Sequence, residues 1–172
     1  NVPESYRLGV EMEGGFDISR KLKLEGNLTL SQNKIKSFTE YRDNWDTGIQ
    51  DLINHGETDI AFSPNMIATG ALTYVSDNDV NYNNEDKLSI SLLGKYVGKQ
   101  FIDNTSNDHA ALPAYFFSDL SIQYAFKTKF VKEVELKLLV RNLLNNKYSS
   151  NAWTYRFLSP NYNPVPDDPY AV

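Results

Sequence analysis

Two histidines with acidic neighbours are the residues of this 172-residue chain best suited to acid–base chemistry. His55 lies between Asp51 and Glu57, and His109 follows Asp108. A catalytic role would also need a nucleophile beside the histidine, as in a Ser-His-Asp triad. Neither histidine has a nucleophile in a recognisable setting nearby. The chain is therefore not predicted to be an enzyme, and both histidines are expected to face solvent in loops.

An acidic, amide-rich stretch at 77–86 carries many oxygen atoms that could bind calcium. A calcium loop of the EF-hand type needs Gly at its sixth position and Glu at its twelfth. Counted from Asp77, these positions hold Tyr82 and Leu88. Counted from Asp79, the sixth and twelfth positions hold Asn84 and Ile90, so this start also lacks the required Gly and Glu. The stretch is therefore predicted to be a solvated turn, and the sequence predicts no metal site and no cofactor.

Four aromatic residues in long connections are candidate ligand contacts, namely Tyr41, Trp45, Trp153 and Tyr155. Flat rings bring a large contact area to a ligand with little loss of conformational entropy. The same rings would also suit a belt at the level of lipid head groups. The sequence leaves both interpretations open.

Alternating apolar and polar residues predict the strands that would hold these connections. The pattern marks about six long antiparallel strands, at 6–18, 22–31, 58–74 and 88–101, from near 113 to 126, and from 134 onward. The first two reach the ~9–11 residues that a tilted membrane strand needs and exceed the ~5–6 residues usual in soluble sheets. Pro64 lacks an amide hydrogen, so it is expected at a bulge or near the outer end of the third strand.

The connections between these strands alternate in character. Those after the first, third and fifth strands are turns or compact polar stretches. Those after the second, fourth and sixth strands, near 39–57, 103–112 and 153–172, are longer and carry aromatic residues. Transmembrane barrels show this asymmetry, with short periplasmic turns and long extracellular loops. The alternation therefore favours a membrane barrel.

Composition and charge narrow the function further. The net charge of -5 and the lack of a basic cluster argue against a nucleic-acid partner. The absence of cysteine excludes disulfides and thiolate metal sites. One apolar and one polar face per strand would also fit a soluble or surface β-sandwich that binds a glycan or a protein. Periodicity alone does not separate this alternative from a barrel.

Two sequence segments resemble a known family. The run N-L-L-N-N-K-Y at 142–148, followed by W-T-Y at 153–155, closely resembles the penultimate barrel strand of TonB-dependent outer-membrane receptors. The segment Y-V-G-K-Q-F-I-D-N-T at 96–105, followed by L-P-A-Y at 112–115, is similar to a segment two strands upstream in these receptors. The resemblance covers 62–157 well and the first third of the chain only in general style.

The resemblance implies an all-β fold, the C-terminal part of a large transmembrane barrel in the outer membrane of a Gram-negative bacterium. Residues 1–172 would be a fragment of a single barrel domain that lacks the plug domain and the last strand. The implied function is binding and import of a scarce, bulky ligand such as a ferric siderophore, haem or cobalamin. The implied partners are outer-membrane lipid, the ligand, and TonB, which acts through a plug region absent from this chain.

The resemblance also gives the loop residues a shared role. Tyr41, Trp45, His55, His109, Trp153 and Tyr155 would surround the extracellular vestibule of the receptor. A histidine in that position could contact an iron or haem ligand.

Overall fold

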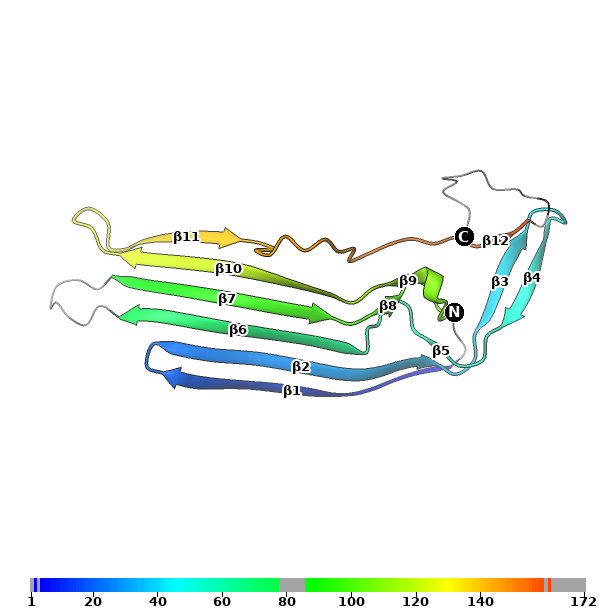
Figure 1. The fold of residues 1–172 in the computed structure, drawn as a ribbon, viewed down its shortest axis with the longest axis horizontal. Helices are drawn as coiled ribbons and strands as arrows, with labels where there is room; N and C mark the ends of the chain where they lie inside the picture. Colours follow the sequence, from blue (N-terminus) through cyan, green and yellow to red (C-terminus); the bar gives the residue numbers. More distant parts are fainter. Residues whose placement is uncertain (1, 3, 78–85, 160, 162–172) are drawn as a thin grey trace.

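The computed structural model describes residues 2, 4–77, 86–159 and 161. Its main antiparallel sheet has the strand order β1–β2–β6–β7–β10–β11 (Figure 1). The long strands are β1 (Ser5–Ser19), β2 (Leu22–Ile35), β6 (Met66–Asp77), β7 (Lys87–Val97), β10 (Tyr115–Phe126) and β11 (Val134–Val140). Each strand lies beside the preceding long strand of the chain. The predicted all-β, antiparallel architecture is confirmed.

The two ends of this sheet differ in the connections that they carry (Figure 1). At one end, which we call the turn end, a two-residue turn joins β1 to β2, and the 127–133 connection joins β10 to β11. The opposite end, which we call the loop end, holds the connections after β2 and β7 and the chain after β11. Most of the turn predicted at 77–86 lies outside the described residues.

The strand register gathers the predicted apolar residues on one face of the sheet. One row across all six long strands consists of Phe16, Leu24, Leu72, Leu92, Leu120 and Val140. Phe16 is 67% exposed and Leu138 is 57% exposed. Among the described residues no second sheet covers this face. A β-sandwich buries its apolar faces against each other, so the structure does not support the sandwich alternative.

The opposite face of the sheet is more polar. One row across it consists of Asp17, Lys23, Thr73, Ser91 and Ser121 and ends on the apolar Leu139 of β11. Lys23 forms an ion pair with Glu25 at 2.7 Å, and Gln123 lies opposite Lys137. The polar face that the alternation predicts for each strand is therefore shared by neighbouring strands.

A row of small residues crosses the apolar face and consists of Gly14, Gly26, Gly70, Gly94 and Ser118. A Cβ atom added at Gly14 would meet nothing within 4 Å. The row therefore leaves a shallow groove of about 640 Å³ between Met12 and Phe16. At Gly94 the ring of Phe116 fills this space, 3.0 Å from the position of an added Cβ.

The predicted long connection at 39–57 contains a hairpin, which the sequence analysis missed. Its strands are β3 (Thr39–Asn44) and β4 (Ile49–Asn54). Gly48 takes a positive φ of 69° in the four-residue turn, a conformation that favours glycine. The side chain of Asn44 accepts hydrogen bonds from the amides of Asp46 and Thr47 at 3.1 and 3.2 Å. Local turn chemistry thus builds the hairpin.

The predicted third strand was placed too early. A short strand, β5 (Thr58–Asp59), pairs with the end of β2, and β6 begins only at Met66. Between them Phe62 has a positive φ of 51°, and its amide donates to the carbonyl of Phe101 at 2.8 Å. Pro64 lies in this connection, outside the strand, where its carbonyl accepts from Ser31 Oγ at 3.3 Å.

The predicted fourth strand is divided. β7 ends at Val97, and β8 (Gln100–Phe101) pairs instead with β9 (Ala111–Leu112). A single turn of 3-10 helix, η1 (Asp108–Ala110), lies between β8 and β9. The connection predicted at 103–112 is thus a structured unit. Its last residue, Leu112, is buried, as are Val97 and Ile35 nearby at the loop end.

The last long strand is shorter than the resemblance suggested. β11 ends at Val140, because Asn142 takes a positive φ of 50° and its amide donates to Asp119 Oδ1 at 2.8 Å. The run at 142–148 therefore follows the strand instead of continuing it. Near the end of the described residues, β12 (Phe157–Leu158) pairs in parallel with β3. Residues 162–172 of the predicted loop lie outside the described residues.

Candidate functional site

A three-stranded sheet lies at the loop end, in the order β12–β3–β4 (Figure 1). Tyr41 lies within it, and Trp45, His55, Trp153 and Tyr155 lie in the segments next to its strands. β3 and β4 come from the connection after β2, whereas β12 comes from the far end of the described chain. The register places Phe157 beside Asp43, and the amide of Trp45 donates to the carbonyl of Leu158 at 2.9 Å. We call this unit the mouth sheet.

One face of the mouth sheet is aromatic and exposed. It carries Tyr41, Trp45, Leu52, Trp153, Tyr155 and Phe157, and we call it the outer aromatic face. Tyr41 lies opposite Leu52 in the register, and each is 63% exposed. Trp153 is 80% exposed. Large apolar groups left in solvent on a rigid sheet are typical of a surface that contacts another molecule.

The rings of this face form a continuous series. Trp45 stacks on Phe157 with a centroid distance of 4.0 Å and an interplanar angle of 11°. Tyr155 follows Phe157 at 6.1 Å, and Trp153 follows Tyr155 at 6.3 Å. Alternate residues of an extended segment point the same way, so residues 153, 155 and 157 share this face.

A carboxylate lies among these rings. The Asp43 carboxylate accepts hydrogen bonds from the Tyr155 hydroxyl at 2.5 Å and from the side-chain amide of Gln50 at 2.8 Å. These bonds, the Tyr155 bond first, hold the pKa of Asp43 below its ordinary value. A hollow of about 340 Å³ adjoins this carboxylate and is lined by Asp43, Asn44, Trp45, Gly48, Ile49 and Gln50.

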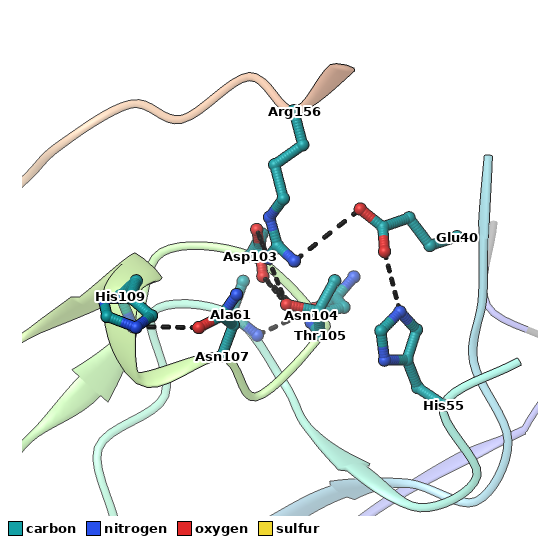
Figure 2. A network of polar contacts seen from close by, with 9 residues as sticks. All are labelled: Glu40, His55, Ala61, Asp103, Asn104, Thr105, Asn107, His109 and Arg156. Atoms are coloured by element: carbon teal, nitrogen blue, oxygen red, sulfur yellow. Dashed lines mark hydrogen bonds and ion pairs between the residues drawn. The ribbon is translucent and has the colours of Figure 1, made fainter. Parts of the chain in front are cut away.

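The opposite, inner face of the mouth sheet is charged. Arg156 alternates with the aromatic residues and points inward, where its guanidinium pairs with Asp103 and bonds Thr105 (Figure 2). It also approaches Glu40 Oε1 at 3.7 Å. Glu40 in turn contacts the His55 ring through Oε2 at 2.7 Å. The Arg156 side chain is only 18% exposed, so this network is shielded from solvent.

Asp103 is the acidic anchor of this network. Burial alone would raise the pKa of Asp103, but hydrogen bonds from the Thr105 side chain and amide, together with Arg156, outweigh that effect and lower it. Asp103 therefore stays charged opposite Arg156. Since the ion pair is partly desolvated, it is stronger than a pair on the open surface.

The 103–112 connection is also fixed to β5 and to the residues that follow it. The amide of Ala61 donates to Asn104 Oδ1 at 2.8 Å (Figure 2). The Ser106 hydroxyl accepts from the amide of Asp59 at 2.7 Å and donates to its carboxylate at 3.0 Å. Asp59 also pairs with Lys34 of β2 at 2.9 Å. Arg156 thus ties the mouth sheet to a unit that is itself anchored on the main sheet.

The predicted site residues fall into three groups. Tyr41, Trp45, Trp153 and Tyr155 lie on the outer aromatic face. His55 lies behind it, where its ring contacts Glu40 and stacks against Phe38 at 6.1 Å. His109 belongs to η1, where its amide donates to the Asn107 side chain at 2.9 Å (Figure 2). Whether any of these residues binds a ligand stays a prediction.

Sequence reasoning did not find several residues that build this region. Arg156 and Glu40 have no sequence signal of their own, because their pairing depends on β12 returning to β3. A second aromatic cluster, Tyr115, Phe117 and Tyr148, lies on the polar face of the main sheet near the loop end. Tyr148 stacks on Tyr115 at 4.4 Å and on Phe117 at 5.7 Å. Tyr115 and Phe117 are recognisable from the sequence as aromatic residues near the loop end of their strand. Their stacking with Tyr148 depends on the path of the chain after β11.

Two negative findings hold for the described ranges. In 2, 4–77, 86–159 and 161, no helix is long and apolar enough to cross a membrane. Within the same part of the chain, no group of three or more His, Asp or Glu side chains is placed to hold a metal ion.

Comparison with known proteins gives one match. The family model described as TonB dependent receptor-like, beta-barrel matches residues 1–143, which include the first third of the chain and all the long strands. No curated protein and no solved structure matches the chain. The members of this family are outer-membrane receptors and transporters rather than enzymes. The chain belongs to the TonB-dependent receptor β-barrel family.

Proposed function

We propose that these 172 residues form part of a single barrel domain in an outer-membrane receptor that binds and imports a scarce, bulky ligand, such as a ferric siderophore, haem or cobalamin. The loop end is the extracellular mouth of this barrel. The apolar face of the main sheet contacts lipid, and the polar face lines the lumen. TonB acts through a plug region outside these residues.

The outer aromatic face of the mouth sheet carries this proposal. Tyr41 lies on a paired strand and Trp45 in the turn that follows it. Trp153 and Tyr155 precede β12, where Arg156 ties their segment to Asp103 and the Tyr155 hydroxyl is bonded to Asp43. Rigid positioning lowers the entropy that a ligand contact must overcome. Trp and Tyr rings are also the residues that most often dominate binding energy at recognition surfaces. We therefore assign the first contact with the ligand to Tyr41, Trp45, Trp153 and Tyr155.

The two histidines have separate parts in this proposal. His55 supports the sheet from behind through Glu40, and its ring reaches the ligand only if that contact opens. His109 lies on the neighbouring 103–112 unit and borders the same mouth. Both remain candidate contacts for an iron or haem ligand.

Removal of the β3–β4 hairpin from the complete receptor is expected to weaken uptake and leave barrel assembly intact. Thr39 and Asn54 are partners in the register, and their side chains are bonded at 2.8 Å. A short Gly/Ser linker can therefore replace the residues between them without moving the neighbouring strands. Growth on ferric siderophores, haem or cobalamin as the sole source measures uptake. Heat-modifiable migration in gels measures assembly.

The matched control is a shortened 127–132 connection at the turn end. This change removes a similarly exposed segment from the opposite end of the barrel and should leave uptake unchanged. Loss of uptake in the control, with normal uptake after removal of the hairpin, would show that the two ends have been assigned the wrong way round.

A further inference from the structure

Two carboxylates beside the outer aromatic face lack a basic partner. Among the ion pairs of the described residues, Glu40 and Asp103 pair with Arg156, and Asp108 pairs with Lys99. Asp43 is held instead by the neutral donors Tyr155 and Gln50. Like any aspartate with an ordinary or lowered pKa, Asp43 is charged at neutral pH. The negative charge on this face is therefore not neutralised within the site.

Asp46, at the tip of the hairpin, is held in the same way. Its carboxylate accepts from Ser159 Oγ at 3.0 Å and from the Asn161 amide and side chain at 3.1 and 2.9 Å. The arginine nearest along the chain, Arg42, alternates with Asp43 and so belongs to the inner face. The outer aromatic face thus combines exposed rings with the Asp43 carboxylate, and the hairpin tip next to it adds the Asp46 carboxylate. The hydrogen bonds to both carboxylates come from neutral donors.

The hollow beside Asp43 has the chemistry of a cation site. A Trp ring attracts a positive group through the negative charge of its face, and Trp is the best side chain for this contact. A carboxylate adds charge-assisted hydrogen bonds to an ammonium or guanidinium group. Trp45 and Asp43 line the same hollow, whose volume of about 340 Å³ lies at the small end of the ~300–1,000 Å³ range of ligand pockets.

We propose that the outer aromatic face selects a ligand that carries a positively charged organic group, which binds between the Asp43 carboxylate and the Trp45 ring. The proposal rests on the receptor function above and specifies the charge of its ligand. Ligands rich in carboxylates, including polycarboxylate iron chelates and haem with its propionates, would place like charge beside Asp43 and Asp46. They are therefore disfavoured.

The test uses three ferric trihydroxamate chelates that share one iron-binding core. One carries a free ammonium arm, one has that arm acetylated to a neutral amide, and one has it succinylated to a carboxylate. Affinities are measured by titration of the complete receptor in detergent micelles. We expect the cationic chelate to bind about tenfold more tightly than the neutral one, and the anionic chelate to bind most weakly. The preference should shrink as salt is raised, because salt screens exposed charges.

Two variants assign the effect to its residue. Asp43→Asn should remove most of the preference for the cationic chelate, because it removes the charge and retains the shape. Asp108→Asn is the matched control, since Asp108 is exposed at the same end of the barrel but pairs with Lys99. It should leave the order of affinities unchanged. Heat-modifiable migration of both variants confirms that assembly is intact.

The other outcomes separate this inference from the receptor function. Equal binding of the three chelates, or tightest binding of the anionic one, overturns the inference and leaves an iron-chelate receptor standing. A preference that survives Asp43→Asn also overturns it. Failure to bind any of the three overturns it as well, and growth on haem or cobalamin then decides the receptor function independently.

Discussion

Replacement of Leu92 by Arg is expected to stop the barrel from assembling in the outer membrane. Leu92 lies on β7, inside the sheet, in the apolar row between Leu72 and Leu120. An arginine on the lipid face costs about 2–4 kcal/mol at the middle of the bilayer. The yield of folded protein should therefore fall by about tenfold or more. The fraction that migrates as heat-modifiable barrel, after expression into membranes, measures this yield.

Leu93→Arg provides a matched control one residue along the same strand. Leu93 points to the polar face, where its register partners are Ala71 and Asp119. An arginine there meets a carboxylate and the lumen instead of lipid, so assembly should proceed. Equal yields of folded protein from the two variants would contradict the assignment of faces.

The second large effect is expected from Arg156→Gln, which should loosen the mouth sheet and leave the barrel folded. The substitution removes the cation that pairs with Asp103. It also removes the guanidinium near Glu40, whose remaining ion-pair partner among the described residues is His55. Unpaired, partly buried charges of this kind cost about 1–3 kcal/mol, which corresponds to about 5–150-fold in a local opening equilibrium. Amides that join β12 to β3, including that of Trp45, should exchange faster by this factor. Hydrogen exchange followed by mass spectrometry on the complete receptor measures it.

Two further variants show whether the effect belongs to Arg156. Arg20→Gln removes an exposed arginine from the turn between β1 and β2 and should change nothing at the mouth. Arg156→Lys keeps the charge but lacks the planar fork that reaches several acceptors at once, so its exchange rates should be intermediate. Unchanged protection in Arg156→Gln would mean that backbone pairing alone holds β12 in place.

The sequence predicts the main sheet well because a period of two is a local property. Leu22, Leu24 and Leu28 show which way their strand faces without knowledge of any neighbour. The same logic gives the alternation of turns and long connections, because each antiparallel strand reverses the chain. The prediction from alternation fails between Thr58 and Met66. The apolar residues Ala61 and Phe62 suggest that the strand has already begun, but the backbone turns at Phe62.

The mouth sheet is harder to predict for a different reason. The inner face of β3 and β4 covers charged groups such as Glu40 and the outer face is exposed, so Tyr41, Asp43 and Leu52 follow no apolar period that marks a strand. The role of Arg156 depends on contacts with Glu40 and Asp103, which are far from it in the chain. The aromatic residues could be chosen by type alone, and four of the six predicted site residues do share one face. Their separation from His55 and His109 comes from tertiary structure.

The parallel pairing of β12 with β3 also sets the order of events when the protein folds. Tyr155 and Asp43 are separated by 112 positions in the sequence, and Ser159 and Asp46 by 113. Contacts of such high contact order form late, because the intervening chain must first be ordered. The β3–β4 hairpin can form locally, whereas we expect its third strand to join after β6, β7, β10 and β11 are in place, because closing so long a loop costs entropy. We therefore expect the outer aromatic face to be completed only on a chain whose wall strands have already assembled, so that competence for recognition follows the completion of folding.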